Sequence, residues 1–134
     1  MPAQLNETLE IRNSSDVVAV RQATRALAER TGLSLVDQTK LVTAASELAR
    51  NTLTYGGGGT VRLGALENGV RRGVRLTFED QGPGIPDIEQ ALKDGFTTGT
   101  GLGLGLGGAR RLVNEFNIES TPGQGTRVTI ARWK

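Results

Sequence analysis

The first half of the chain contains two stretches in which apolar residues recur at every third or fourth position. The first follows the residues Asn-Ser-Ser-Asp at 13–16, which favour the N-terminal cap of a helix, and it stops at Gly32. The second covers about 35–54 and stops before the four glycines at 56–59. This spacing predicts two consecutive helices, each with one apolar face.

Alternation of apolar and polar residues predicts strands in the rest of the chain. The alternating runs lie at about 8–12, 60–66, 72–80, 116–121 and 126–133. Turn signals at 67–69 and 122–125 join the last four runs into two hairpins, and short helices are expected at 87–93 and 109–115. The pattern therefore indicates an α+β two-layer sandwich, in which a mixed, largely antiparallel sheet is covered on one face by helices.

The composition of the chain excludes several classes of function and partner. A chain of 134 residues without internal repeats is expected to form a single domain over 1–134. Its net charge is only +2 and aromatic residues make up 4%, so no nucleic-acid partner is expected. The absence of a leader pattern and of a long apolar segment favours a cytoplasmic protein without a membrane partner. Because the chain has no Cys and no His, a catalytic base must be a carboxylate, Lys or Tyr.

A dense run of glycines covers 99–108 and is followed by residues with a helical pattern. Glycine lets a backbone approach a ligand closely and point its N–H groups at it, which suits phosphate. The alternative is a flexible linker, but the alternating leucines disfavour it because such linkers are polar. The formal match to G-x-G-x-x-G at 103–108 does not follow a strand that opens a βαβ unit, and no Walker A sequence exists. The run therefore predicts a phosphate-gripping loop of another kind.

Glu47 and Asn51 lie four residues apart on the second predicted helix, so they share one face about a turn from each other. One interpretation is a solvated polar patch on an exposed helix, because this spacing is common. The functional interpretation is a carboxylate base beside an amide oxygen that ligates a hard cation such as Mg²⁺.

Asp80 and Thr126 fall on the core side of their predicted strands. Val74, Leu76 and Phe78 alternate with polar residues, which places Asp80 on the apolar face. A carboxylate there requires donors, either from the following loop or from the exocyclic amine of a ligand. Thr126 shares the face of the apolar residues that follow it, and it is either an ordinary β-branched strand residue or a polar group at a ligand site.

Taken together and in order, these motifs resemble those of a known superfamily. The motifs are Glu47-x-x-x-Asn51, Asp80-x-Gly82-x-Gly84, Gly99-x-Gly101-Leu-Gly103-Leu and Gly125-Thr126. They look like the N, G1 and G2 boxes and the trailing Gly-Thr of the GHKL (Bergerat-fold) ATPases, which include gyrase, Hsp90, histidine kinases and MutL. Within that superfamily the chain is most similar to the small serine/threonine kinases of anti-sigma and partner-switching modules, of the RsbT type.

The resemblance implies ATP and Mg²⁺ as cofactors and gives each matching position a role. Asp80 would accept a hydrogen bond from the adenine amine, Thr126 would reach the base through a water, and Gly82 and Gly84 would line it. Asn51 would bind Mg²⁺, and Glu47 would orient or deprotonate the attacking hydroxyl. The nucleotide loop would comprise Thr97, Thr98, Gly101, Leu102, Gly103, Leu104 and Gly105, with the glycine N–H groups facing the phosphates.

By the same resemblance, the chain would phosphorylate serine or threonine on STAS-domain scaffold and antagonist proteins. Once released, it would activate a PP2C-type phosphatase upstream of an alternative sigma factor. The alternatives are an anti-sigma factor that inhibits a sigma factor directly and a non-catalytic module whose partner binding is gated by ATP. The presence of Glu47 favours catalysis, because a pure binding module does not need a base. A sheet face bearing Arg62, Arg75, Arg127 and Trp133 is expected to be free of helices and open to a partner.

Overall fold

The computed structural model describes residues 6–85, 92 and 106–134. Its elements are β1 (Asn6–Ile11), α1 (Ser14–Thr31), α2 (Leu35–Thr54), β2 (Gly59–Asn68), β3 (Arg71–Asp80), α4 (Leu106–Arg111), β4 (Glu115–Thr121) and β5 (Gly125–Trp133). The helix expected at 87–93 and most of the glycine run fall outside the described residues.

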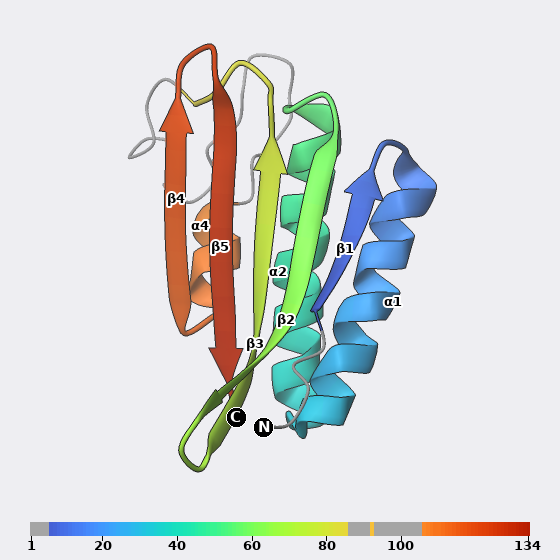
Figure 1. Ribbon diagram of the computed structural model, residues 1–134, viewed down its shortest axis with the longest axis vertical. Helices are drawn as coiled ribbons and strands as arrows, with labels where there is room; N and C mark the ends of the chain where they lie inside the picture. The colour runs from blue at the N-terminus through green and yellow to red at the C-terminus, as the bar shows by residue number, and fades with distance from the viewer. Residues whose placement is uncertain (1–5, 86–91, 93–105) are drawn as a thin grey trace.

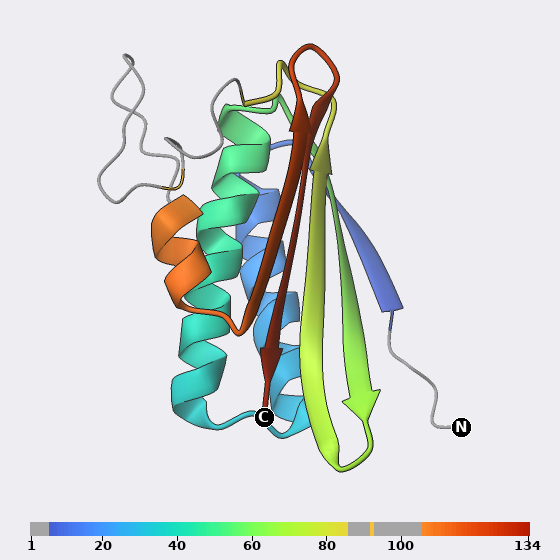
Figure 2. The same cartoon turned by 90° about the vertical axis from the view of Figure 1, so that its left-hand side faces the viewer.

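The strands form one five-stranded sheet in the order β1-β2-β3-β5-β4, and α1, α2 and α4 all lie on one of its faces (Figures 1 and 2). This arrangement confirms the predicted α+β two-layer fold. The four pairings between described strands are all antiparallel, so this sheet has no parallel pair. For the β1–β2 pair the reason is that α1 and α2 run in opposite directions between the two strands, which brings the chain back beside β1 in the opposite direction (Figure 1).

Local sequence signals set the ends of the two long helices, as the pattern predicts. The Asn13 side chain accepts a hydrogen bond from the backbone N–H of Asp16, and the Ser34 hydroxyl accepts one from that of Asp37. Gly32 ends α1 in the left-handed conformation, with φ of 90°. The connection between the helices is therefore only three residues long, and α1 packs directly against α2.

The core lies between the helices and the inner face of the sheet. Fully buried side chains from both layers meet there, among them Val20, Leu41, Leu48, Val61, Leu76, Phe78 and Ile130. From Leu41 to Thr52, α2 supplies a buried stripe that packs on the sheet (Figure 2). Its C-terminal end is thereby held above the end of β3.

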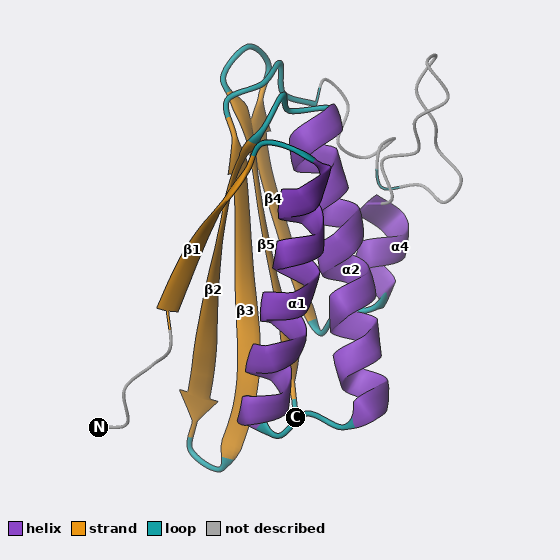
Figure 3. Cartoon of the chain, turned by 90° about the vertical axis from the view of Figure 1, so that its right-hand side faces the viewer, coloured by secondary structure: helices purple, strands orange, loops and turns teal. Residues whose placement is uncertain are grey.

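The short helix α4 begins earlier and ends earlier than the expected 109–115. Leu106 and Ala109 are one turn apart and both are buried, and α4 packs alongside α2 (Figure 3). The helix ends at Arg111 because the following residues already pair with β5: the backbone N–H of Asn114 donates to the carbonyl of Ala131 at 2.9 Å. The predicted start of this helix was wrong because Gly107 and Gly108 have low helix propensity. Packing against α2 nevertheless stabilises a helix there.

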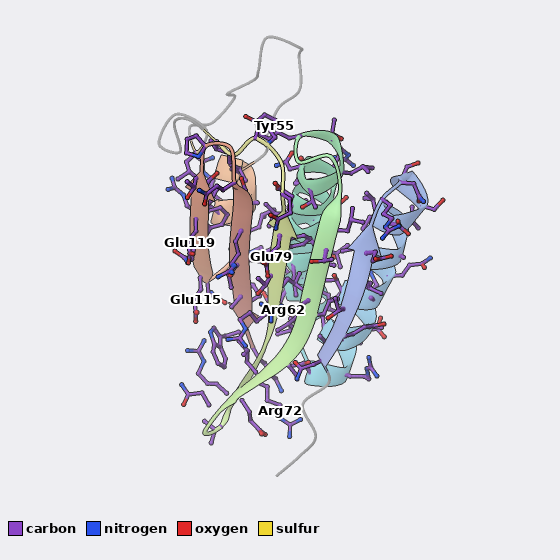
Figure 4. The ribbon with its side chains drawn as sticks, turned by 45° about the horizontal axis from the view of Figure 1, so that its top comes forward. Tyr55, Arg62, Arg72, Glu79, Glu115 and Glu119 are labelled. Atoms are coloured by element: carbon purple, nitrogen blue, oxygen red, sulfur yellow. The ribbon has the colours of Figure 1, made fainter. Side chains whose placement is uncertain are left out.

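The opposite face of the sheet is free of helices among the described elements, as expected (Figure 2). Figure 4 shows Arg62, Glu79 and Glu119 on this face. Glu79 makes ion pairs with Arg62 at 3.4 Å and with Arg127 at 3.6 Å, and the Trp133 indole N–H donates to Glu115 at 2.6 Å. No helix within the described residues is long and apolar enough to cross a membrane.

An ion pair fastens the beginning of α2 to the end of β5. The Arg132 guanidinium donates to Asp37 at 2.8 Å, and the two side chains are only 15% and 23% exposed. This hydrogen bond from Arg132 holds the pKa of Asp37 below its ordinary value despite partial desolvation. The pair therefore stabilises the fold most where Asp37 is ionised.

We expect Asp37→Asn to lower the free energy of unfolding by about 1.5–3 kcal/mol at neutral pH, the range for a hydrogen bond to a charged group. A lowered carboxyl pKa contributes stability that is present above the unfolded-state pKa, about 3.9, and is lost as pH falls through the folded-state pKa. Urea unfolding at several pH values will therefore show the difference between parent and variant shrinking below about pH 4.

The matched control is Glu67→Gln, which removes an exposed pair whose Arg72–Glu67 distance is 3.9 Å. Glu67→Gln should lower the free energy of unfolding much less than Asp37→Asn does. A pH-independent difference for Asp37→Asn would contradict the role assigned to its charge.

Candidate functional site

A pocket opens where the C-terminal part of α2 meets the end of β3 and the start of β5. Its walls combine apolar side chains with three of the polar residues singled out from the sequence, namely Asn51, Asp80 and Thr126. The apolar lining comes from Leu48, Phe78, Ile85, Leu106 and Val128, together with Thr52 and Tyr55. The fold therefore brings together residues that are 75 positions apart in the sequence.

Asp80 lies at the end of β3 on the inner face, directly opposite Thr126 of β5. Its Oδ1 accepts a hydrogen bond from the backbone N–H of Gly82 at 2.9 Å, and the backbone N–H of Thr126 also donates to the carboxyl. Burial raises the pKa of Asp80, and these two hydrogen bonds offset only part of that effect. Among the described residues Asp80 makes no ion pair, so its remaining acceptor capacity is suited to a ligand N–H group.

Two glycines allow this carboxyl to sit under the end of α2. A Cβ on Gly56 would overlap the Asp80 side chain, and a Cβ on Gly82 would lie 2.8 Å from the Cα of Gly56. Sequence reasoning identified Gly82 but treated Gly56 only as part of a helix stop. The signal for Gly56 was the position of a glycine two residues beyond the end of the helix that carries Glu47 and Asn51.

The loop from Gly82 to Ile85 is held on both sides. Gly84 adopts φ of 79°, its carbonyl accepts a hydrogen bond from the Tyr55 hydroxyl at 3.1 Å, and Figure 4 shows Tyr55 near that loop. On the other side, the backbone N–H of Ile85 donates to the Ser120 hydroxyl at 2.7 Å. Sequence reasoning did not single out Ser120, although it is the inward-facing partner of Thr126 in the last hairpin.

Glu47 lies one turn before Asn51 on α2 and is not part of the pocket wall. Its side chain is 39% exposed and accepts a hydrogen bond from Arg50 at 3.0 Å. Asn51 itself contributes to the pocket wall. A carboxylate that is accessible to a protein partner thus lies beside an amide at the edge of the pocket.

The remaining predicted residues of the site, Thr97, Thr98 and the segment 101–105, lie outside the described residues. Leu106 follows Gly105 directly and lines the pocket, so the glycine run reaches the described structure at the site. Within the described residues no three His, Cys, Asp or Glu side chains form a metal-binding group. At the pocket wall Asn51 offers an amide oxygen, a ligand type that suits a hard cation.

Comparison with known proteins places this geometry in a family. The model of the family described as "Histidine kinase-, DNA gyrase B-, and HSP90-like ATPase" matches residues 36–134. The chain is 42% identical over 125 residues to Serine/threonine-protein kinase RsbT of Bacillus subtilis (strain 168), an alignment that covers 93% of this chain and 94% of that protein. It is 32% identical over 96 residues to an Anti-sigma F factor of Thermoanaerobacter sp. (strain X514), which covers 68% of this chain and 66% of the relative.

Solved structures show the same fold. The structure of the RsbU and RsbW domains of Rv1364c from Mycobacterium tuberculosis superposes with a TM-score of 0.63 at 22% identity, covering 97% of this chain and 32% of that one. The catalytic domain of histidine kinase ThkA superposes with a TM-score of 0.54 at 17% identity, covering 94% and 95% of the two chains.

These findings confirm the resemblance inferred from the four motifs, and they extend it from separate motifs to nearly the whole length of the chain. The chain belongs to the histidine kinase-, DNA gyrase B- and HSP90-like (GHKL) ATPase family and, within it, to the serine/threonine-protein kinases of the RsbT type.

Proposed function

We propose that this kinase transfers the γ-phosphoryl group of Mg²⁺-bound ATP to serine or threonine residues of STAS-domain scaffold and antagonist proteins. When released from them, it activates a PP2C-type phosphatase upstream of an alternative sigma factor in a partner-switching pathway. The observation that carries the proposal is the placement of Glu47 one turn from Asn51, beside a pocket that contains Asp80. The relative named Serine/threonine-protein kinase RsbT supports the reaction type.

The base of ATP occupies the inner part of the pocket in this proposal. Phe78, Ile85 and Val128 provide apolar surfaces for the ring. The exocyclic amine donates to Asp80, whose side chain is already fixed by two backbone N–H groups. Thr126 reaches the base through a water, and the backbone at Gly82 and Gly84 is proposed to line it. An amine donor fits this end of the pocket because the carboxyl is an acceptor without a cationic partner among the described residues.

The phosphates lie toward the glycine run and Asn51. The N–H groups of Gly101, Gly103 and Gly105 are proposed to contact them, with Thr97, Thr98 and the intervening leucines in the same loop. The Asn51 amide oxygen is a suitable ligand for Mg²⁺, which takes few protein ligands and keeps waters and substrate phosphate oxygens. When bound, the cation supplies charge neutralisation at the phosphates.

Glu47 acts as the general base. The attacking hydroxyl oxygen of the partner forms a bond to the γ-phosphorus, the bond to the β–γ bridging oxygen breaks, and ADP departs. The hydroxyl proton passes to the Glu47 carboxylate, whose partial exposure leaves it accessible to a side chain on another protein. Most of the acceleration then comes from positioning and from electrostatic stabilisation.

A second candidate function is direct inhibition of a sigma factor. It is favoured by the likeness to Anti-sigma F factors, although the identity to that of Thermoanaerobacter sp. (strain X514) is 32% over 68% of the chain, against 42% over 93% for the kinase relative. A third is a module in which ATP only gates partner binding. Both alternatives need ATP but not Glu47, so the Glu47 variant separates them from the kinase.

We expect Glu47→Gln to abolish phosphoryl transfer to STAS-domain partners while leaving the dissociation constant for ATP within about twofold of the parent, because the base contacts the acceptor rather than the nucleotide. Transfer is measured with radiolabelled ATP, and ATP binding by calorimetry. The control is Glu29→Gln, an exposed carboxyl on α1. Retention of full transfer by Glu47→Gln would contradict the base assignment.

Asp80→Asn should weaken ATP binding by about tenfold or more, because an amide cannot accept from both backbone N–H groups and the ligand amine. The affinity for ITP, which has an oxygen in place of the amine, should fall much less. The matched control is Glu79→Gln on the opposite face of the same strand. If parent and Asp80→Asn bind ATP equally well, Asp80 does not contact the base.

Asn51→Ala should remove the dependence of ATP binding on Mg²⁺, because it deletes the protein oxygen proposed as a ligand. Binding is titrated with and without Mg²⁺, with Glu47→Gln as the control that keeps the dependence. A variant whose ATP affinity still rises on adding Mg²⁺ as much as that of the parent would refute the ligand assignment.

A further inference from the structure

The side of α2 that faces away from the sheet carries a continuous row of side chains. Val36, Thr43 and Glu47 share one face of the helix by their spacing, and Thr39 lies beside the line that they form. α2 lies between α1 and α4 in the helical layer, and neither covers this row, which is exposed as far as Thr43 and half-buried at Glu47 (Figure 3). We call these four residues the outer row of α2.

The outer row begins with apolar surface. Val36 is 63% exposed and its neighbour Leu35 is 71% exposed, so a partner that covers them removes apolar surface from water. The Thr39 hydroxyl donates to the carbonyl of Leu35 at 3.0 Å, so its proton already has an acceptor within the helix. Thr43 is uncharged as well, and Lys40 flanks the row. This half of the row is therefore suited to an apolar counterpart.

The other end of the row indicates which partner lies on it. In the proposed reaction, a hydroxyl of another protein reaches Glu47 from solvent. Beyond Glu47 the helix leads to Asn51 and Tyr55, which line the pocket. An acceptor protein that leaves the nucleotide in place therefore extends from Glu47 in the opposite direction, toward Val36.

The dimensions of a protein interface agree with this direction. A helix rises 1.5 Å per residue, so Val36 lies about 16 Å from Glu47 along α2. A standard interface covers about 800 Å² on each partner, which is a patch roughly 30 Å across. One folded acceptor domain can thus contact Val36 while its hydroxyl is at Glu47.

We propose that the outer row of α2 is the docking surface for the phosphoacceptor protein. The acceptor covers Leu35 and Val36 with an apolar patch that lies about 16 Å from the hydroxyl that is phosphorylated. The inference rests on the proposed function, in which Glu47 receives the proton of that hydroxyl. It goes further in assigning acceptor recognition to a surface away from the nucleotide and in stating the chemistry of its counterpart.

The first experiment introduces a charge at the apolar end of the row. Val36→Glu should weaken acceptor binding about tenfold or more, because the carboxylate would be desolvated against an apolar patch. Binding is measured by calorimetry with a hydrolysis-resistant ATP analogue, so that no transfer takes place. In steady-state assays with ATP, KM for the acceptor should rise by a similar factor, while kcat and the dissociation constant for ATP stay within about twofold of the parent.

Two further variants test whether the effect belongs to this surface. Leu35→Glu should act in the same direction as Val36→Glu, and both should fold, because glutamate is favourable in the first turn of a helix. The matched control is Val70→Glu, which makes the same chemical change at a fully exposed residue in the turn between β2 and β3. It should leave acceptor binding and KM unchanged.

A second experiment locates the acceptor directly. The chain has no cysteine, so Val36→Cys provides a single attachment point for a thiol-reactive photo-crosslinker. The labelled kinase should crosslink to apolar residues of the acceptor, about 16 Å from its phosphorylated residue. The same label on Val70→Cys should give no crosslink.

The inference is overturned if Val36→Glu and Leu35→Glu bind the acceptor as tightly as the parent does. It is also overturned if these variants lose only the activation of the phosphatase, because the surface then belongs to that partner. Failure of the proposed function gives a different result: the parent, with its outer row intact, would transfer no phosphoryl group to STAS-domain proteins, and the docking inference would fall with it.

Discussion

The close approach of two backbone segments determines the rest of the site. Gly56, just beyond α2, lies against Gly82, just beyond β3, and no side chain fits between them. This contact brings the end of the helix that carries Asn51 over the strand end that carries Asp80. The core below keeps α2 in place, because buried residues along its length pack on the sheet. Without the glycine contact, the helix and strand would still pack, but the pocket would lose its geometry.

Three carboxylates show how their surroundings set different roles. Asp37 is paired with Arg132 at the far end of α2 and contributes to stability, whereas Glu47 is partly exposed and forms an ion pair with the neighbouring Arg50. Asp80 is half-buried, is held by backbone N–H groups and has no cation beside it among the described residues. Of these three carboxylates, the one with no ion-pair partner in the described structure is thus the one in the pocket wall, where a half-buried acceptor favours a donor.

Much of the fold could be predicted from the sequence, because its signals are local. Helix caps at Asn13 and Ser34 and the alternation around Asp80 depend on neighbours a few residues away. The bounds of α4 could not be predicted, because its burial against α2 is a tertiary effect. Ser120 and Gly56 were missed for a similar reason: each acts on a residue of the site through a contact that exists only after the sheet and the helix have come together.

The position of β5 has a consequence for the order of assembly. It follows the other described elements in the chain, yet it lies inside the sheet, between β3 and β4. The helical hairpin and the first three strands can associate with one another earlier during synthesis, since their contacts do not involve it. Thr126 and Val128 arrive only with this strand, so a chain without it has no complete wall to the pocket.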